Sequence, residues 1–393
     1  MLSKAIKESL RGIETPFYLY DMGLLGRTLD TIRAEAERGD ANGKSYKIHY
    51  AIKANNDERI LKAVLERGFG IDCVSGNELR LIRRLGFPAD GIVYAGVGKS
   101  DGEIELGVRE GIRAFNCESR QELQVIDEIA GRLGMRARVA LRINPDVDPQ
   151  THRHISTGQA DSKFGISYRE IEQVATELPT YKNLDFQGLH FHIGSQITDM
   201  RVFEFFCRRV NSLVGWFAER GFPVGYINMG GGLGVNYDAP DAEPMPDFGA
   251  YFDAFRRNLE VGDAEVHFEL GRAMVAQCGE LITRVLFNKI NSAGNEVAII
   301  DGSMSELIRP ALYEAYHEIE NLDTRAGDQR RPYIVAGTVC ESSDVFASDR
   351  VLPELRRGDL VTLKSAGAYG QSMSSQYNMH SLPRIVYSDQ IES

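Results

Sequence analysis

Hydrophobic residues before residue 270 come in short runs, and longer stretches with apolar residues at helical spacing separate these runs. The runs have the length and composition of buried β-strands. Strands that alternate with helices are typical of βα units, which build a parallel sheet. The predicted strands span residues 47–52, 70–74, 92–95, 114–117, 138–143, 186–191, 226–229 and 266–269, and the predicted helices include residues 57–67, 78–85, 120–133 and 202–220.

Eight such strands within roughly 225 residues indicate an α/β fold with a closed (β/α)8 barrel of the TIM type. A doubly wound sheet would have fewer strands and a glycine-rich fingerprint after the first one. The first strand here instead runs into "YAIKANN", residues 50–56. We therefore expect a barrel over residues 25–265.

The pattern changes after Arg272, where short predicted strands follow one another with turns between them. They lie at residues 281–285, 297–301, 333–336 and 360–363, and one helix is predicted near residues 305–320. An early strand at residues 17–20 is expected to join them. A second, mostly β domain is therefore predicted from residues 1–24 and 266–393, and the Pro- and Asp-rich stretch 238–248 is expected to be a surface loop.

The composition is that of a globular protein, with 43% hydrophobic and 26% charged residues among 393. A net charge of −11 and the lack of a Lys/Arg-rich run argue against nucleic acid as a partner. The five cysteines are widely spaced and never form CxxC, which argues against a disulfide framework or a zinc site. No stretch could span a bilayer and no signal peptide is evident, so we expect a cytoplasmic protein without a membrane partner.

Polar residues cluster where the predicted barrel strands end. Because the carboxyl ends of all strands in such a barrel face one cavity, these residues are expected to share one site. A single lysine at a strand end usually extends into water, but the convergence of so many polar groups favours a functional role for Lys53. The residues are Lys53, Asp72, Ser75, Glu118, Arg142, Asn144, His192, Ser195, Gly230, Gly231, Gly232, Glu269 and Arg272.

Two short motifs follow later strands. "NMGGGLG", residues 228–234, lies after the seventh strand, where barrels frequently hold phosphate with backbone N–H groups. "HFH" places His190 and His192 on one face of the sixth strand. Such a pair could bind a metal, as in barrel hydrolases, but no further histidine stands at another strand end and HExxH is absent. A metal-dependent hydrolase therefore remains a remote alternative.

A lysine, a phosphate cradle, a flat imidazole and a carboxylate together suit pyridoxal 5'-phosphate. Its aldehyde condenses with an amine, which Lys53 can provide. A carboxylate such as Glu269 beside the pyridine nitrogen keeps that nitrogen protonated, and the ring then accepts the electrons released when CO2 leaves. Glutamate at this position favours decarboxylation over racemisation.

The chain resembles the pyridoxal-phosphate-dependent barrel decarboxylases, a family whose members act on diaminopimelate, ornithine or arginine. The resemblance implies an alanine-racemase-like fold (fold type III) and a homodimer with composite active sites. The matching blocks occur in the family's order along nearly the whole chain. They are "TPFYLYD" (15–21), "YAIKANN" (50–56), "GVGKSD" (96–101), "RINPDVD" (142–148), "KFGI" (163–166), "HFHIGSQITD" (190–199), "GGGLG" (230–234), "ELGR" (269–272), "SELIRPALYEAYH" (305–317), "CESSD" (340–344) and "SAGAYG" (365–370).

The resemblance also implies residue roles. Lys53 would hold the cofactor covalently, and His192 would stack on its ring. Cys340, reaching in from the partner subunit, would return a proton after CO2 leaves. Phosphate and ring contacts would come from Ser195, Gly231, Gly232, Glu269, Leu270, Gly271, Arg272 and Tyr369.

Substrate choice depends on the second domain. Arg309 and Tyr313 lie four residues apart on one predicted helix face, and with Arg272 they could bind a distal carboxylate. Glu341 could bind the distal ammonium group, and Tyr369 would also contact substrate. An added arginine would repel the substrate of an ornithine decarboxylase. These residues fit meso-2,6-diaminopimelate, whose decarboxylation gives L-lysine in the last step of lysine biosynthesis.

Three positions depart from the family pattern: Leu270 replaces proline, Asn77 replaces glycine and His380 replaces arginine. None removes an assigned chemical group. They leave open a decarboxylase for another amino acid, such as D-lysine, ornithine or a carboxynorspermidine-type precursor. A small non-catalytic barrel that only binds pyridoxal phosphate would lack both the second domain and Cys340.

Overall fold

The computed structural model describes residues 8–39, 43–145 and 163–391. It divides the chain into two compact units. Unit 1 comprises Met1–Thr28, Val235–Pro246 and Arg272–Ser393, and unit 2 comprises Leu29–Gly234 and Asp247–Gly271. Unit 1 is therefore built from both ends of the chain together with one short internal segment. None of the helices in the described ranges is long and apolar enough to cross a membrane.

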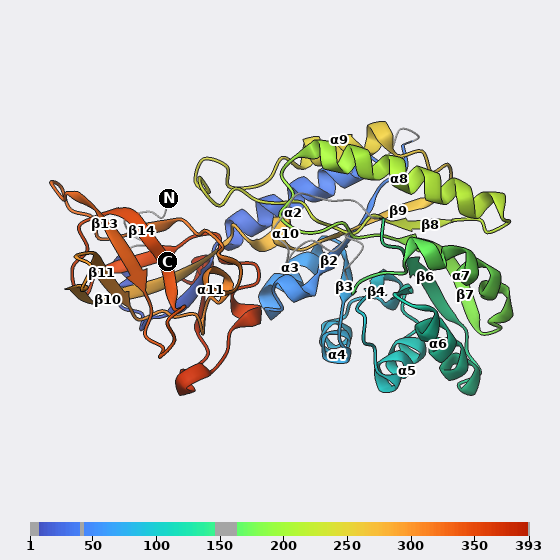
Figure 1. Ribbon diagram of the computed structural model, residues 1–393, viewed down its shortest axis with the longest axis horizontal. Helices are drawn as coiled ribbons and strands as arrows, with labels where there is room; N and C mark the ends of the chain where they lie inside the picture. The colour runs from blue at the N-terminus through green and yellow to red at the C-terminus, as the bar shows by residue number, and fades with distance from the viewer. Residues whose placement is uncertain (1–7, 40–42, 146–162, 392–393) are drawn as a thin grey trace. The chain divides into compact units, whose positions relative to one another are not determined.

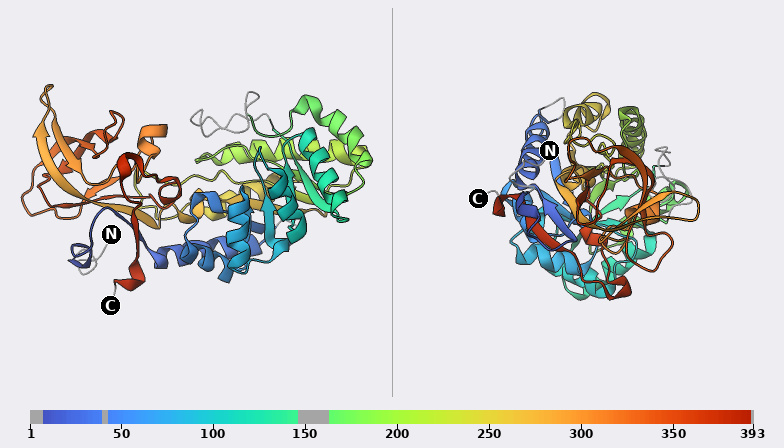
Figure 2. Two further views of the ribbon diagram at one scale, coloured as in Figure 1. Left: turned by 90° about the horizontal axis from the view of Figure 1, so that it is seen from below. Right: turned by 90° about the vertical axis from the view of Figure 1, so that its left-hand side faces the viewer.

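Unit 2 contains a closed barrel of eight parallel strands, which confirms the predicted barrel. Each predicted strand overlaps an observed one, and β9 pairs with β2 to close the barrel. Helices cover the outside of the strands (Figures 1 and 2). The strands are β2 (Lys47–Ala51), β3 (Gly70–Cys73), β4 (Ile92–Tyr94), β5 (Ala114–Cys117), β6 (Ala137–Arg142), β7 (Leu184–His190), β8 (Tyr226–Asn228) and β9 (Glu265–Leu270). The helices are α3 (Glu58–Glu66), α4 (Gly76–Arg84), α5 (Asp101–Glu110), α6 (Arg120–Arg132), α7 (Ile171–Glu177), α8 (Met200–Glu219) and α9 (Phe248–Asn258), and α2 (Met22–Glu37) precedes β2.

The turn after β2 is fixed from both sides. The short 3-10 helix Ile52–Ala54 follows the strand directly. Asp57 then caps α3, where its carboxylate accepts hydrogen bonds from the backbone N–H groups of Arg59 and Ile60. Such a cap is worth about 1 kcal/mol. The asparagines of "YAIKANN" thus lead into the helix that is predicted at residues 57–67, and Lys53 lies on the turn between them and the strand.

The side chains of β9 point alternately to the outside and to the inside of the barrel. Phe268 packs against the rings of Phe252 and Phe255 on α9, with centroid distances of 5.2 and 4.8 Å. Successive side chains of a strand point to opposite faces. Glu269, the next residue, therefore points into the barrel, and the aromatic cluster outside anchors the strand that carries it.

Unit 1 is built mostly from β-strands, which form one sheet, and this confirms the predicted mostly β domain. β10 lies near its centre, and β1 pairs with β10 in antiparallel fashion, which confirms the early strand. The predicted helix at residues 305–320 is wrong in extent. Only α11 (Arg309–Tyr313) is helical, because Glu314 adopts a left-handed conformation (φ 54°) that ends it. The strands are β1 (Phe17–Tyr20), β10 (Gly279–Ile290), β11 (Glu296–Ile300), β12 (Ile319–Asn321), β13 (Arg330–Ala336), β14 (Val345–Pro353), β15 (Leu360–Leu363) and β16 (Arg384–Tyr387).

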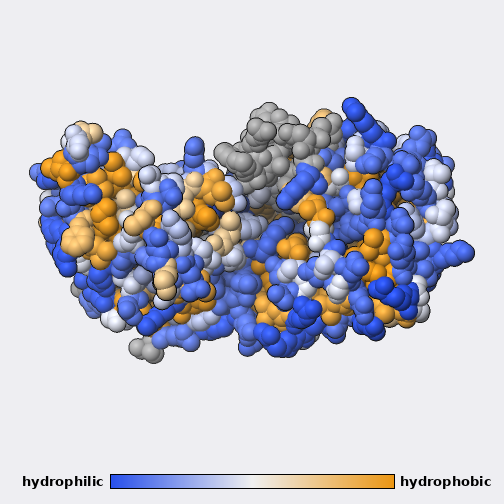
Figure 3. All heavy atoms as spheres, turned by 60° about the horizontal axis from the view of Figure 1, so that its bottom comes forward, coloured by the Kyte–Doolittle hydropathy of each residue, from blue (hydrophilic) through white to orange (hydrophobic). Residues whose placement is uncertain are grey.

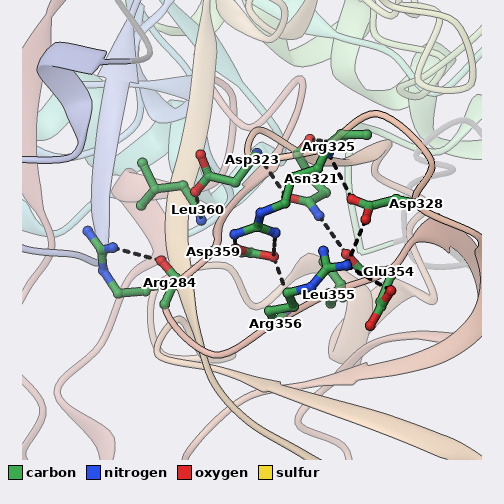
Figure 4. Close-up of polar contacts among 12 residues, drawn as sticks. Arg284, Asn321, Asp323, Arg325, Asp328, Glu354, Leu355, Arg356, Asp359 and Leu360 are labelled. Atoms are coloured by element: carbon green, nitrogen blue, oxygen red, sulfur yellow. Dashed lines mark hydrogen bonds and ion pairs between the residues drawn. The ribbon is translucent and has the colours of Figure 1, made fainter.

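An ion-pair network ties two loops of unit 1 together (Figure 4). Arg325, between β12 and β13, pairs with Asp359 at 2.9 Å. Arg356, between β14 and β15, pairs with Asp328 at 2.7 Å and with Glu354 at 2.8 Å. Ion pairs with partly exposed arginines are individually weak, but this network joins the two loops at several points.

Candidate active site

Glu269 is the centre of a buried polar cluster inside the barrel. Its Oε1 accepts hydrogen bonds from Nδ2 of Asn116 at 2.9 Å and from Nδ2 of Asn228 at 2.7 Å. Its Oε2 lies 2.8 Å from Nε2 of His190. These partners come from β5, β8 and β7, so four strands converge on one carboxyl group. Burial raises the pKa of Glu269 to about 7, although the charges of Lys53 and Arg142 oppose this shift.

Asp72, at the end of β3, places a second carboxyl group in the same interior. Burial raises its pKa well above the usual range, and the nearby charge of Glu269 raises it further. Its Oδ1 is buried without a hydrogen-bond partner among the described residues. Two buried carboxyl groups, both with raised pKa values, form a site that a positive charge would stabilise.

Lys53 provides one positive charge at this site. Its charge lowers the pKa values of both Glu269 and Asp72, so it lies within electrostatic reach of both carboxyl groups. The expected position of Lys53 at the end of the strand needs correction, because the residue follows the strand on a 3-10 turn. Lys53 is exposed. The turn leaves the amine accessible at the carboxyl end of the barrel.

The two histidines of "HFH" have different environments. Strand β7 ends at His190, so the expected placement of both rings on one strand face does not hold. His190 lies beside Glu269, and burial lowers its pKa well below 6.5. Nδ1 of His192, beyond the strand, accepts a hydrogen bond from the N–H of Gly231 at 3.3 Å. Burial also lowers the pKa of His192 well below 6.5. Both rings are therefore neutral.

The glycine segment after β8 packs closely against neighbouring backbone. A Cβ atom added to Gly230 would lie 2.3 Å from the carbonyl oxygen of Phe191, and one added to Gly231 would lie 2.1 Å from that of Glu269. Gly230 also has a positive φ of 66°. Side chains are excluded here on both steric and conformational grounds. The segment thus joins the loop that carries His192 to the end of β9.

The other predicted strand-end residues have identifiable roles. Arg142 pairs with Glu118 at 2.5 Å inside the barrel. Ser75 caps α4, where its hydroxyl accepts a hydrogen bond from the N–H of Glu78. A Cβ atom on Gly271 would contact those of Ala51 and Ala54, which flank Lys53, at 3.2 Å. Leu270 is buried in β9, and the N–H of Asn144 donates a hydrogen bond to the carbonyl oxygen of Ile166. Ser195 lies in the loop after β7. Residues 146–148 of "RINPDVD" fall outside the described residues.

Unit 1 carries a second polar cluster, centred on Tyr237. Arg272 donates a hydrogen bond from Nη1 to the Tyr237 hydroxyl at 2.6 Å. The Arg272 guanidinium also lies over the ring of Tyr369, with Cζ 4.9 Å from its centroid. Burial alone would raise the pKa of Tyr237, but the charges of Arg272 and Arg309 together lower it. Tyr369 adopts a positive φ of 55°, a conformation that non-glycine residues rarely occupy outside special sites.

Arg309 begins α11 and belongs to the same cluster. Its Nη1 lies 2.8 Å from Nε2 of His317, and its Cζ lies 4.7 Å from the centroid of Tyr237. Tyr313, four residues on, is partly buried. The sequence pattern identified Arg272, Arg309, Tyr313 and Tyr369, but not Tyr237 or His317. The position of His317 at the end of "SELIRPALYEAYH" is the one signal that could have singled it out.

Cys340 lies on an exposed loop between β13 and β14. Asp344 organises this loop by accepting hydrogen bonds from the N–H groups of Met304 at 2.7 Å and Val339 at 3.0 Å. The N–H of Cys340 donates to Oδ1 of Asn378 at 2.8 Å. Glu341 is also exposed. Its carboxylate accepts a hydrogen bond from the N–H of the next residue, Ser342. Both side chains are thus exposed on a loop that backbone hydrogen bonds organise.

A separate cavity of about 710 Å3 opens at the amino-terminal end of the barrel. Its lining includes Lys47, His49, Arg113 and His267, which lie at or near the starts of their strands. Because the strands are parallel, this cavity lies at the opposite end from Lys53. In the described part of the chain, no group of His, Cys, Asp and Glu side chains is arranged to hold a metal ion.

Comparison with known proteins identifies relatives over nearly the whole chain. Residues 29–276 match the family described as "Pyridoxal-dependent decarboxylase, pyridoxal binding domain". A diaminopimelate decarboxylase from Bacteroides thetaiotaomicron is 47% identical, over 98% of this chain and 98% of that protein. One from Aquifex aeolicus is 40% identical, over 95% of this chain and 87% of that protein. The crystal structure of diaminopimelate decarboxylase from Helicobacter pylori complexed with L-lysine has a TM-score of 0.87 and 36% identity, and covers 97% of this chain and 93% of that one.

Proposed function

We infer that this chain, which belongs to the pyridoxal-dependent decarboxylase family, converts meso-2,6-diaminopimelate into L-lysine and CO2. The observation that carries this proposal is Arg309. It is a buried cation that contacts the neutral rings of His317 and Tyr237, and it can bind the second carboxylate of this substrate. A substrate with one amino-acid group would leave this charge unused.

The barrel residues fit pyridoxal 5'-phosphate. When bound, this cofactor supplies an aldehyde for the substrate's amine and a ring that accepts the electrons released with CO2. Lys53 is the amine that would hold it, and its exposed position on the turn leaves it accessible. The buried carboxyl groups of Glu269 and Asp72, whose pKa values burial raises, suit a protonated ring nitrogen.

Glu269 would hold the proton on the ring nitrogen. Its hydrogen bonds from Asn116, Asn228 and His190 fix the orientation of the carboxylate. Because His190 is neutral, it orients Glu269 without cancelling its negative charge. His192 would pack on the ring, and the backbone of the glycine segment, with Ser195, Arg272 and Tyr369, would bind the phosphate.

Substrate recognition would come from unit 1. Arg309, Tyr313 and Arg272 would bind the distal carboxylate, and Glu341 the distal ammonium group. Cys340 would donate the proton that replaces CO2 at the reacting carbon. Each of these groups is one that the diaminopimelate chain, with two amino-acid ends, requires.

We also propose a homodimer in which the Cys340 loop completes the site of the partner subunit. Cys340 is exposed and held on an organised loop. Of the twelve large hydrophobic side chains exposed among the described residues, eight belong to unit 1, and Met379, adjacent to Asn378, is 95% exposed. Figure 3 shows hydrophobic residues scattered among hydrophilic ones on the face that it presents. A second copy of unit 2 would cover such a surface.

The test is CO2 release from a panel of meso-diaminopimelate, L-ornithine, L-arginine and D-lysine, with pyridoxal 5'-phosphate added. We expect release from meso-diaminopimelate at a kcat/KM well above that for the other three. A preference for any compound without a distal carboxylate would overturn the assignment and would indicate one of the related decarboxylases.

A further inference from the structure

Arg309 carries a buried charge and contacts two neutral rings, those of His317 and Tyr237. The residue is 5% exposed, and burial lowers the pKa of its guanidinium group. Its Nε has no hydrogen-bond partner among the described residues. No ion pair joins it to a carboxylate in the ranges that the structure describes. A buried charge is costly unless polar groups stabilise it, so the groups around Arg309 must do so.

His317 is one of these groups, and its two ring nitrogens allow a single protonation state. Nε2 lies 2.8 Å from Nη1 of Arg309, and Nδ1 lies 2.8 Å from the carbonyl oxygen of Lys364. A guanidinium group only donates, so Nε2 must accept, and a carbonyl only accepts, so Nδ1 must donate. Both contacts are satisfied only by the neutral ring with its proton on Nδ1.

The burial of His317 agrees with this assignment. The residue is 1% exposed, and burial together with the charge of Arg309 lowers its pKa to about 3. His317 therefore stays neutral throughout the pH range in which the protein would work. Its contact with Lys364, on the chain directly after β15, fixes the ring from the side opposite Arg309.

Tyr237 is the second neutral neighbour. Its ring lies against Arg309, with the centroid 4.7 Å from Cζ, and packs edge-on against His317 at a centroid distance of 5.3 Å. An aromatic face stabilises a cation without neutralising it. Arg309 is thus held by an imidazole acceptor and a ring face, neither of which carries a negative charge.

We propose that His317 is a positioning residue that orients Arg309 through a neutral acceptor and leaves its positive charge available to the distal carboxylate of the substrate. The inference rests on the proposed function, because it assigns Arg309 to that carboxylate. A glutamate at position 317 could orient Arg309 equally well, but the ion pair so formed would compete with the substrate. Neutrality, and not hydrogen bonding alone, is therefore the property that matters at this position.

The test compares three variants, His317→Gln, His317→Glu and His317→Met. Glutamine and glutamate have the same shape and differ in charge, and methionine is of similar length without a strong acceptor. The measurement is the dissociation constant of L-lysine by calorimetry, with the cofactor-loaded protein. L-lysine keeps the carboxylate distal to the reacting carbon. The control ligand, 1,5-diaminopentane, is the same chain without that carboxylate.

We expect H317Q to bind L-lysine within about threefold of wild type, and H317E and H317M to bind it at least about tenfold more weakly. Binding of 1,5-diaminopentane should change little in any variant. Rescue by glutamine alone would not follow from a merely structural role, and thermal denaturation midpoints check folding. If H317E does not fold, the contrast between H317Q and H317M decides.

Two outcomes would overturn the inference. In the first, wild type binds L-lysine, and H317Q binds it no better than H317E or no better than H317M. The role of His317 as a neutral positioning residue is then wrong, while the proposed function stands. If wild type neither binds L-lysine nor releases CO2 from meso-diaminopimelate, the proposed function and this inference are both wrong.

Discussion

Nε2 of His190 lies 2.8 Å from Oε2 of Glu269, so an imidazole on β7 and a carboxylate on β9 are joined inside the barrel. The ring is neutral, because burial lowers its pKa. It can therefore fix the direction of the carboxylate and leave its charge intact. The same arrangement, a charged group held by a neutral histidine, recurs in unit 1 between Arg309 and His317.

Replacement of Glu269 by glutamine should reduce CO2 release by at least about 10²-fold, on the scale of losing a preorganised electrostatic contact. The amide keeps the shape of the side chain but cannot keep a ring nitrogen protonated. Bound cofactor, measured by its visible absorbance, should remain. The control is Glu265→Gln on the same strand at the opposite end of the barrel, which should be nearly fully active. Near-normal activity of E269Q would show that the carboxylate is not at the ring nitrogen.

The cofactor-free protein should become less stable between about pH 5 and 7.5 relative to its E269Q variant. The pKa of Glu269 is raised from 4.5 to about 7 in the folded state. Its contribution is therefore fully present below pH 4.5 and is lost as pH rises through 7, by at most about 3 kcal/mol. The buried histidines have the opposite pH dependence but are common to both proteins. Asp72 adds to the difference in the same direction as Glu269, because the charge of Glu269 raises its pKa.

Urea unfolding at several pH values measures this difference in the free energy of unfolding. The free energy of unfolding of E269Q relative to that of wild type should increase as pH rises, and this increase should level off above about pH 8. A difference that does not vary with pH would mean that Glu269 ionises in the folded protein at its ordinary pKa.

Replacement of Lys53 by alanine should remove both the covalent link to the cofactor and nearly all turnover. Borohydride reduction followed by peptide mapping should place the label on Lys53 in wild type. The control is Lys47→Ala, at the start of the same strand, which should keep the label and the activity. A label on any other lysine would contradict the cofactor assignment.

Replacement of Arg309 by glutamine should lower kcat/KM for meso-diaminopimelate. The loss should correspond to ~2–5 kcal/mol of transition-state free energy, the range for a buried charge that loses its partner. D-lysine, which lacks the distal carboxylate, should lose much less. Steady-state kinetics with both substrates gives the comparison. Equal losses would indicate that Arg309 only supports the fold of unit 1.

Mixed dimers test the composite site. Lys53→Ala and Cys340→Ala proteins should each be nearly inactive, and subunit exchange between them should restore activity to roughly a quarter of wild type. This follows because about half of the dimers are mixed, and each mixed dimer has one site with neither change. Mixing would restore nothing if both residues acted within one chain. Sedimentation analysis of each protein checks the dimer itself.

The hydrophobic pattern of the sequence determined the barrel. Each strand is a short apolar run, and the spacing of β2 to β9 required alternating helices, so local periodicity was sufficient. Local chemistry was also sufficient for the cap of α3 by Asp57, which contacts residues two and three positions away. The pattern failed for residues 305–320, because the left-handed Glu314 and the contact of His317 with Lys364 override their helical spacing.

Single groups of the candidate site were visible in the sequence because a lysine, a glycine run or a glutamate at a strand end has its own chemistry. Their environments were not, because these depend on contacts between distant parts of the chain. Asn116 and Glu269 are 153 positions apart, and burial at their meeting point raises the pKa of the carboxyl group. Tyr237, which contacts Arg309, directly precedes the stretch 238–248 that is predicted as a surface loop. The sequence by itself therefore determined which chemical groups are present and on which strands, whereas only the tertiary structure decided their charge states and partners, because desolvation and hydrogen bonding arise when distant segments pack together.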